Sequence, residues 1–113
     1  VKVSIIVLDA SLRVRLWNRQ SFEMWGLLEE EVLGSPFLGL DIGLPRDLLA
    51  PALMAGLKGD SSHHELQLRA TNRRGKRIVC RVGISPMEPA DIRPEGVIVL
   101  IEQEAEVAPD AEP

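Results

Sequence analysis

The sequence predicts an α+β domain in which one antiparallel sheet of five strands carries short helices on one face. Two observations indicate this fold class. Strand-like segments open and close the chain, and a helical stretch lies between them. The hydrophobic fraction of 45% and the charged fraction of 27% are ordinary for a globular protein, and 113 residues suffice for a single hydrophobic core. We therefore expect one domain.

The first two strands are expected over residues 3–8 and 12–17. Residues 3–8 form an apolar run that stops at Asp9, a pattern that indicates a strand buried on both faces and hence central in the sheet. Residues 12–17 alternate, with Arg13 and Arg15 on one face, so this strand should be half exposed and nearer an edge. The short connection between the two strands favours an antiparallel hairpin.

Two short helices should follow. Asn18 is a favourable N-cap, because its side chain can accept a hydrogen bond from a backbone N–H one turn on, and Gly26 is a typical helix end. A second helical turn over residues 29–33 begins with three glutamates, which suit the positive end of the helix dipole, and it ends at Gly34.

An apolar loop and a longer helix complete the middle of the chain. Residues 35–45 contain two glycines and two prolines but also five large apolar side chains, so this loop should lie on the core. Residues 47–58 carry leucines at i, i+4 and i+8, which is typical of an amphipathic helix. Pro51 is expected near its first turn, where a missing N–H costs least, and Gly59 should end it.

Three strands should close the sheet. Residues 65–71 and 77–85 alternate around the turn 72–75, which is a strong hairpin signal. A proline-containing connection over residues 86–94 leads to residues 96–102, a second apolar run that should be buried.

The order of these features resembles the PAS domain family, whose members are sensory and protein-interaction modules. The matching residues are Asp9, the strand leading to Trp17-Asn18, Trp25-Gly26 and Glu31-Val32-Leu33-Gly34. The resemblance implies the PAS fold with strand order 2-1-5-4-3. It also implies that residues 1–103 are the domain and that 104–113 are an acidic, disordered tail or linker.

A narrower resemblance concerns PAS domains fused to bacterial chemotaxis-type methyltransferases. It rests on residues 25–27, 31–34, 37–45, 72–75 and 84–86. The chain begins within a strand and without Met, so we expect it to be a piece of a larger protein. The resemblance implies a regulatory module that forms a homodimer and passes a signal to a neighbouring effector, either a methyltransferase or a histidine kinase.

An alternative function is a sensor that holds a small apolar ligand between the sheet and the helices. In this fold the wall of such a pocket would be formed by Trp25, Phe37, Leu40, Leu49, Leu53, Met54, Ile84 and Val99. Apolar residues at helical or strand spacing fill a core by default, and few convergent polar groups are visible to orient a ligand, so the simple core is the favoured interpretation.

Enzymatic chemistry is not indicated, and no metal site is expected. His63 and His64 are adjacent on an extended segment, so their side chains point to opposite faces and are best interpreted as solvated. No set of three or four convergent ligands supports a metal site. The net charge of −4 argues against nucleic acid, with the basic residues 69–81 interpreted as a solvated hairpin.

No cofactor is expected either, although small-ligand binding stays open. Flavin-binding relatives use a reactive cysteine in the helical middle, whereas Cys80 lies in a strand. Haem-binding relatives use a histidine on the long helix, which has none here, and the chain contains no tyrosine for a photoactive chromophore. One cysteine is compatible with the reducing cytoplasm, and the apolar run at residues 5–8 is too short to span a membrane.

Overall fold

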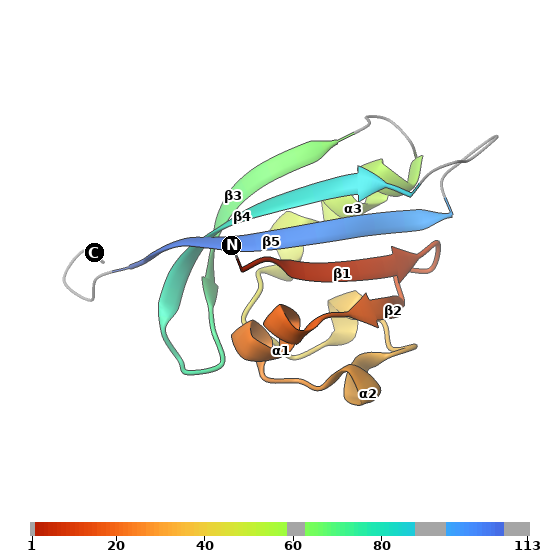
Figure 1. Cartoon of the computed structure of the whole chain (residues 1–113). Coiled ribbons are helices and arrows are strands. Elements are labelled where there is room, and N and C mark those ends of the chain that lie inside the picture. Colours follow the sequence, from red (N-terminus) through yellow and green to blue (C-terminus); the bar gives the residue numbers. More distant parts are fainter. Residues whose placement is uncertain (1, 59–62, 88–94, 108–113) are drawn as a thin grey trace.

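The structure is a computed structural model, and it describes residues 2–58, 63–87 and 95–107. Within these residues the chain forms a five-stranded antiparallel sheet with the order β2-β1-β5-β4-β3, as expected (Figure 1). The elements are β1 (Ser4–Asp9), β2 (Val14–Trp17), α1 (Arg19–Trp25), α2 (Glu29–Val32), the 3₁₀ turn η1 (Phe37–Gly39), α3 (Arg46–Lys58), β3 (His64–Thr71), β4 (Arg77–Pro86) and β5 (Gly96–Glu106).

The helices cover one face of the sheet, which we call the inner face. Helix α3 packs across β3, β4 and β5, while α1 contacts β1 and α2 contacts β2 (Figure 1). The inward positions of β4 are Ile78, Cys80, Val82 and Ile84, and all four are fully buried. The core therefore lies between the inner face and the helices, as the alternation in the sequence predicts.

Asn18 joins the first helix to the first strand. Its Oδ1 accepts hydrogen bonds from the backbone N–H of Ser21 and of Ile5, both at 3.0 Å, and its Nδ2 donates to the carbonyl of Val3 at 2.9 Å. The helix ends at Gly26, whose φ of 82° is the left-handed conformation that glycine adopts without strain. Both expected caps are confirmed.

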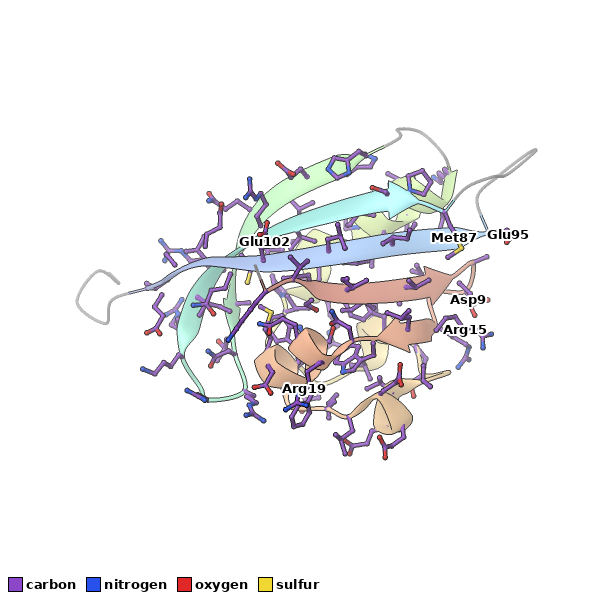
Figure 2. All side chains as sticks on the ribbon, in the orientation of Figure 1. Asp9, Arg15, Arg19, Met87, Glu95 and Glu102 are labelled. Atoms are coloured by element: carbon purple, nitrogen blue, oxygen red, sulfur yellow. The ribbon has the colours of Figure 1, made fainter. Side chains whose placement is uncertain are left out.

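The turn after β1 makes the second strand shorter than expected. Leu12 has a φ of 60°, which is incompatible with an extended strand, so β2 begins at Val14 instead of residue 12. Asp9 holds this turn, because its Oδ1 accepts from the N–H groups of Ser11 and Arg13 while its Oδ2 contacts Arg15 Nε at 2.9 Å (Figure 2).

The prediction that the first strand is buried on both faces is wrong, and the last strand, expected to be buried, is buried on one face only. No helix of the described residues covers the opposite side of the sheet, which we call the outer face (Figure 1). Ile5 on β1 is 36% exposed and Leu100 on β5 is 41% exposed, although both strands are central.

Two boundaries also differ from those expected. Helix α3 begins at Arg46, so Pro51 lies in its second turn, on the exposed side. Strand β5 continues past Gln103 to Glu106, because it stays paired with β4 as far as Ile78 after a bulge. Gly59, the connection over 88–94 and the tail from 108 lie outside the described residues.

Candidate functional site

Most of the predicted pocket residues lie together on the inner side of the sheet. The buried members are Trp25, Phe37, Leu49, Leu53, Ile84 and Val99, each at most 5% exposed. Leu40 is partly buried against the same core. Met54 does not belong with them, because its side chain is 47% exposed. A residue beside Leu53 on a helix is turned by about 100°, and this rotation carries Met54 away from the sheet.

In the part of the chain that the structure describes, two polar side-chain atoms in the interior lack a hydrogen-bond partner. Trp25 Nε1 and His64 Nε2 are both buried without a hydrogen-bond partner among the described residues. The interpretation of His64 as a solvated loop residue is therefore wrong: it opens β3 and faces inward opposite Ile84. Because a buried unpaired donor or acceptor is costly, each atom is a point at which a ligand group could be held.

Three surface depressions of the described residues lie away from the predicted pocket. One, of about 390 Å³, lies between α1 and α2 and includes Trp17, Phe22 and Leu28 in its lining. Two others, of about 320 and 200 Å³, adjoin the hairpin of β3 and β4. None of these three is lined by any of the eight residues predicted for the pocket.

The outer face carries a continuous apolar surface over β2, β1 and β5. Ile5 lies directly opposite Leu100, and Val7 lies opposite both Ile98 and Leu16, so the five side chains are neighbours. We call this set the apolar strip. Ile5, Leu16 and Leu100 are each between 36% and 41% exposed. Clustered exposed apolar side chains on a sheet face are typical of an interaction surface.

The other part of the outer face is charged and internally paired. Arg81 on β4 contacts Glu102 on β5 at 3.4 Å and Glu104 at 3.7 Å, and Gln67 on β3 donates to Glu104 at 2.7 Å. We call this set the charged ladder. Because Arg81, its one basic residue, faces two carboxylates, the charged ladder does not present the free cationic surface that nucleic acid requires.

A histidine lies at the border between these two regions. The Nδ1 of His63 is 2.9 Å from Ser85 Oγ, and its Nε2 is 3.6 Å from a carboxylate oxygen of Glu65. The imidazole lies over Gly83, since a Cβ there would be only 3.1 Å from His63 Cε1. From the sequence, His63, His64 and Glu65 form a weak cluster with no further support, and residues 63 and 65 share a face because they are two apart on an extended segment. The contact with Ser85 was not predicted.

This cluster does not have the geometry of a nucleophile with its base. The separation of His63 and Glu65 is too long for a hydrogen bond, and both side chains are about half exposed. Acyl transfer by serine needs a base that is oriented by a third group and shielded from water.

The other candidate groups offer little reactivity. Burial raises the pKa of the Cys80 thiol to about 11, with a smaller contribution from the charge of Glu104, so the reactive thiolate is scarce at neutral pH. Residues 2–58, 63–87 and 95–107 contain no group of three potential metal ligands. No helix in the part of the chain that the structure describes is long and apolar enough to cross a membrane.

Comparisons with known proteins agree with this architecture. A family model described as the PAS fold matches residues 1–107. The chain is similar to a PAS domain from Colwellia psychrerythraea, with 17% identity and a TM-score of 0.73 over 93% of this chain and 88% of the other. No curated protein sequence matches it significantly.

Two further solved structures share the fold. One is the PAS domain of the histidine kinase ThkA, with 22% identity and a TM-score of 0.69 over 90% of this chain and 99% of that one. The other is the PAS domain of the quorum-sensing receptor RpfR from Cronobacter turicensis in complex with C12:0, with 20% identity and a TM-score of 0.68 over 91% and 94%.

Proposed function

This chain belongs to the PAS fold family, and from that premise we propose that it is a regulatory module of a larger bacterial signal-transduction protein. It docks with a second copy of itself through the apolar strip. It passes a conformational signal to a neighbouring effector domain, either a chemotaxis-type methyltransferase or a histidine kinase. The single cysteine, held as a buried thiol, fits a reducing cytoplasm as its place of action.

The exposed apolar strip is the observation that carries this proposal. Its members lie on the central strands β1 and β5 and the edge strand β2, so they are held rigidly by the sheet ladder. Because no described helix covers them, burying these side chains against a partner would remove apolar surface from water without disturbing the core.

Sedimentation velocity over a range of concentrations tests the docking. The wild-type chain should show a concentration-dependent shift towards a dimer, and Leu100→Gln should weaken that shift by at least tenfold in Kd. Leu48→Gln is the matched control, because Leu48 is 57% exposed on α3, away from the strip. A wild-type chain that stays monomeric at high concentration, or equal losses in both variants, would contradict docking through this face.

A second function, the sensing of a small apolar ligand, is favoured by one specific observation. Trp25 is 5% exposed, yet its indole N–H has no partner among the described residues. A ligand with an apolar body and one acceptor atom would satisfy that donor. The RpfR domain, which shares the fold, was solved with C12:0 bound.

Native mass spectrometry tests this second function, with the denatured mass as reference. Extra mass that disappears on denaturation would support a bound ligand, and Leu53→Trp should then remove it while the fold survives. Leu48→Trp, at an exposed position of the same helix, is the control. Unchanged binding in Leu53→Trp would place the ligand elsewhere.

A further inference from the structure

The two edges of the sheet are closed to different extents. Along β2, the backbone N–H of Val14 donates to the carbonyl of Ser35 at 3.0 Å, and its carbonyl accepts from Gly34 at 2.8 Å. On the opposite edge, β3 is the outermost strand (Figure 1), and the N–H of Thr71 donates to the carbonyl of Gly43 at 3.0 Å. Among the described residues, this last contact closes only the end of β3, because the strand stops at Thr71.

The contact of Thr71 with Gly43 shows how the backbone of β3 is oriented. In an antiparallel ladder, successive residues direct their N–H and C=O groups alternately towards the neighbouring strand and away from it. The groups of Thr71 point away from β4, towards Gly43. Arg77 lies opposite Thr71 and likewise turns its carbonyl away from β3, because that carbonyl accepts from Val107 at 2.9 Å. The odd-numbered positions of β3 therefore direct their backbone groups away from the sheet.

Glu65 and Gln67 are two of these odd-numbered positions. The ladder between β3 and β4 has no register shift, so the alternation holds along the whole strand, and Leu66 between them directs its backbone groups to β4. Within residues 2–58, 63–87 and 95–107, no backbone hydrogen bond accounts for the outward groups of Glu65 and Gln67. We call residues 65–67 the open edge.

The open edge lacks several features that usually protect an edge strand. Natural proteins commonly prevent pairing of edge strands with prolines, lysines, bulges or a very short strand. Strand β3 has eight residues, and it contains no proline, no lysine and no bulge. Leu66 is only partly buried against the core, so apolar surface also remains at this edge. A further strand could therefore gain both backbone hydrogen bonds and apolar contact here.

We propose that the open edge pairs with the open edge of a second copy, antiparallel and about a two-fold axis at Leu66. Glu65 then lies opposite the partner's Gln67, so the outward N–H and C=O groups of both residues find partners in each chain. On the inner side, Leu66 lies beside the partner's Leu66. On the outer side, the carboxylate of Glu65 faces a neutral amide, so no like charges lie opposite each other.

This register also fits the closed end of β3. Because β3 begins at His64, the partner's His64 lies opposite Leu68. The paired strands therefore stay clear of Thr71, whose outward N–H already bonds to Gly43. The register that satisfies Glu65 and Gln67 is thus compatible with the contact that closes the rest of the edge.

The open edge is separate from the apolar strip. The strip lies on β2, β1 and β5, whereas the open edge belongs to β3, on the far side of β4. Docking through the strip joins two chains, and pairing of open edges joins such dimers to one another. At concentrations above those that saturate the strip, the wild-type chain should therefore form species larger than a dimer.

Amide hydrogen exchange, followed by NMR, tests the pairing directly. The Leu100→Gln variant is used, because this substitution weakens docking through the strip and lies away from β3. In a dilute sample the amides of Glu65 and Gln67 should exchange fast, and at millimolar concentration they should exchange at least about tenfold more slowly. The amide of Leu66, which points to β4, should be slow at both concentrations and is the internal control.

Two substitutions at Gln67 separate backbone pairing from side-chain effects. In the Leu100→Gln variant, Gln67→Pro should abolish self-association in sedimentation velocity, because proline lacks the outward N–H; the ladder with β4 does not use that group, so the fold is kept. Gln67→Ala keeps the N–H and should associate as before. Both variants lose the contact with Glu104, so this loss cannot explain a difference between them. Urea midpoints check that both variants are folded.

The outcomes distinguish edge pairing from docking through the strip. Exchange of the Glu65 and Gln67 amides at equal rates in dilute and concentrated samples would overturn edge pairing, and the strip dimer of the wild-type chain would still stand. Slow exchange of these amides in the dilute sample would show that they are already bonded within one chain, which would also overturn it. Equal association of the proline and alanine variants would contradict pairing through the backbone.

Discussion

The two faces of the sheet are built from the same strands but differ in how far their apolar side chains are buried. On β5, Val99 and Ile101 point inward and are fully buried, whereas Leu100 between them is 41% exposed on the outer face. On β1, Ile6 is fully buried and Ile5 is 36% exposed. Composition does not distinguish the two faces at these positions of β1 and β5, because the residues on both sides are apolar. The difference is that the helices of the described ranges cover only the inner side of the sheet.

Apolar residues of the inner face stabilise the fold, whereas those of the outer face can be buried only by a second molecule. Inner side chains contribute stability within one chain, because they leave water when the helices pack on the sheet. Outer side chains contribute little to that stability, and their burial comes only with a second molecule. Substitutions on the two faces should therefore change different measured quantities.

The largest expected difference in unfolding free energy is between alanine substitutions at two neighbouring residues of β5. Ile101→Ala should lower the free energy of unfolding by about 2–5 kcal/mol, because it opens a cavity in a fully buried site. Leu100→Ala should lower it by less than about 1 kcal/mol, since its side chain is already partly in water. Urea denaturation at a concentration where the chain is monomeric measures both. Equal losses would contradict the assignment of the two faces.

The reactivity of Cys80 reports on the inner face without any substitution. With its pKa raised to about 11 by burial, roughly one thiol in a thousand is ionised at pH 8. Labelling with a disulfide reagent should be at least about a hundredfold slower in the native chain than in denaturing urea. A Leu48→Cys variant supplies an exposed thiol for reference, and native labelling of Cys80 at the rate of that thiol would show that the inner face is open.

Asn18 tests how firmly the covering helices are attached to the inner face. Asn18→Ala removes the bonds from Ser21 that cap α1 and the two bonds to the backbone of Val3 and Ile5 that tie this cap to the start of the sheet, and it should cost about 1–2 kcal/mol of unfolding free energy. Asn72→Ala is the control, because its bonds close only the exposed turn of the β3–β4 hairpin, and it should cost less. Thermal denaturation ranks the two variants, and the reverse ranking would contradict this role.

The smallest effect is expected at Asp9, at the end of β1. The backbone N–H of Arg13 is the main cause that lowers the pKa of this carboxyl; Ser11 and Arg15 add to the shift, and burial opposes it. The pKa of Asp9 is lower in the folded chain than in the unfolded chain. Its contribution to the free energy of unfolding is therefore complete above about pH 4 and is lost as the pH falls through the folded pKa.

Asp9→Asn should therefore cost about 0.5 kcal/mol at pH 7, since the amide oxygen still accepts the two backbone bonds while the ion pair with Arg15 is lost. Urea midpoints at pH 7 and pH 2 should show the difference from the wild type shrinking in acid. A difference that grows in acid would reverse the assigned sign.

The sequence predicted much of the fold because the relevant signals are local. The cap at Asn18, the helix end at Gly26 and the alternation of β3 and β4 depend on neighbours within a few residues. The strand order came from the family resemblance, since pairing of β1 with β5 joins distant segments.

The site was less predictable because it depends on how distant segments pack together, which local signals do not reveal. Helical spacing placed Leu49 and Leu53 correctly, but it did not exclude Met54, whose exposure depends on how α3 is rotated on the sheet. An apolar run does not reveal whether a helix or a partner covers it, so the exposure of Leu100 was missed. The contact of His63 with Ser85 requires knowledge of which strands are adjacent.

The most direct test of the central claim is a methyl NMR dilution series on the wild-type chain. If the outer face docks, concentration-dependent shifts should concentrate on the methyl groups of Ile5, Val7, Ile98 and Leu100, while those of Leu48 on α3 stay constant. Shifts confined to α3, or spectra that do not change with concentration, would contradict docking through the outer face.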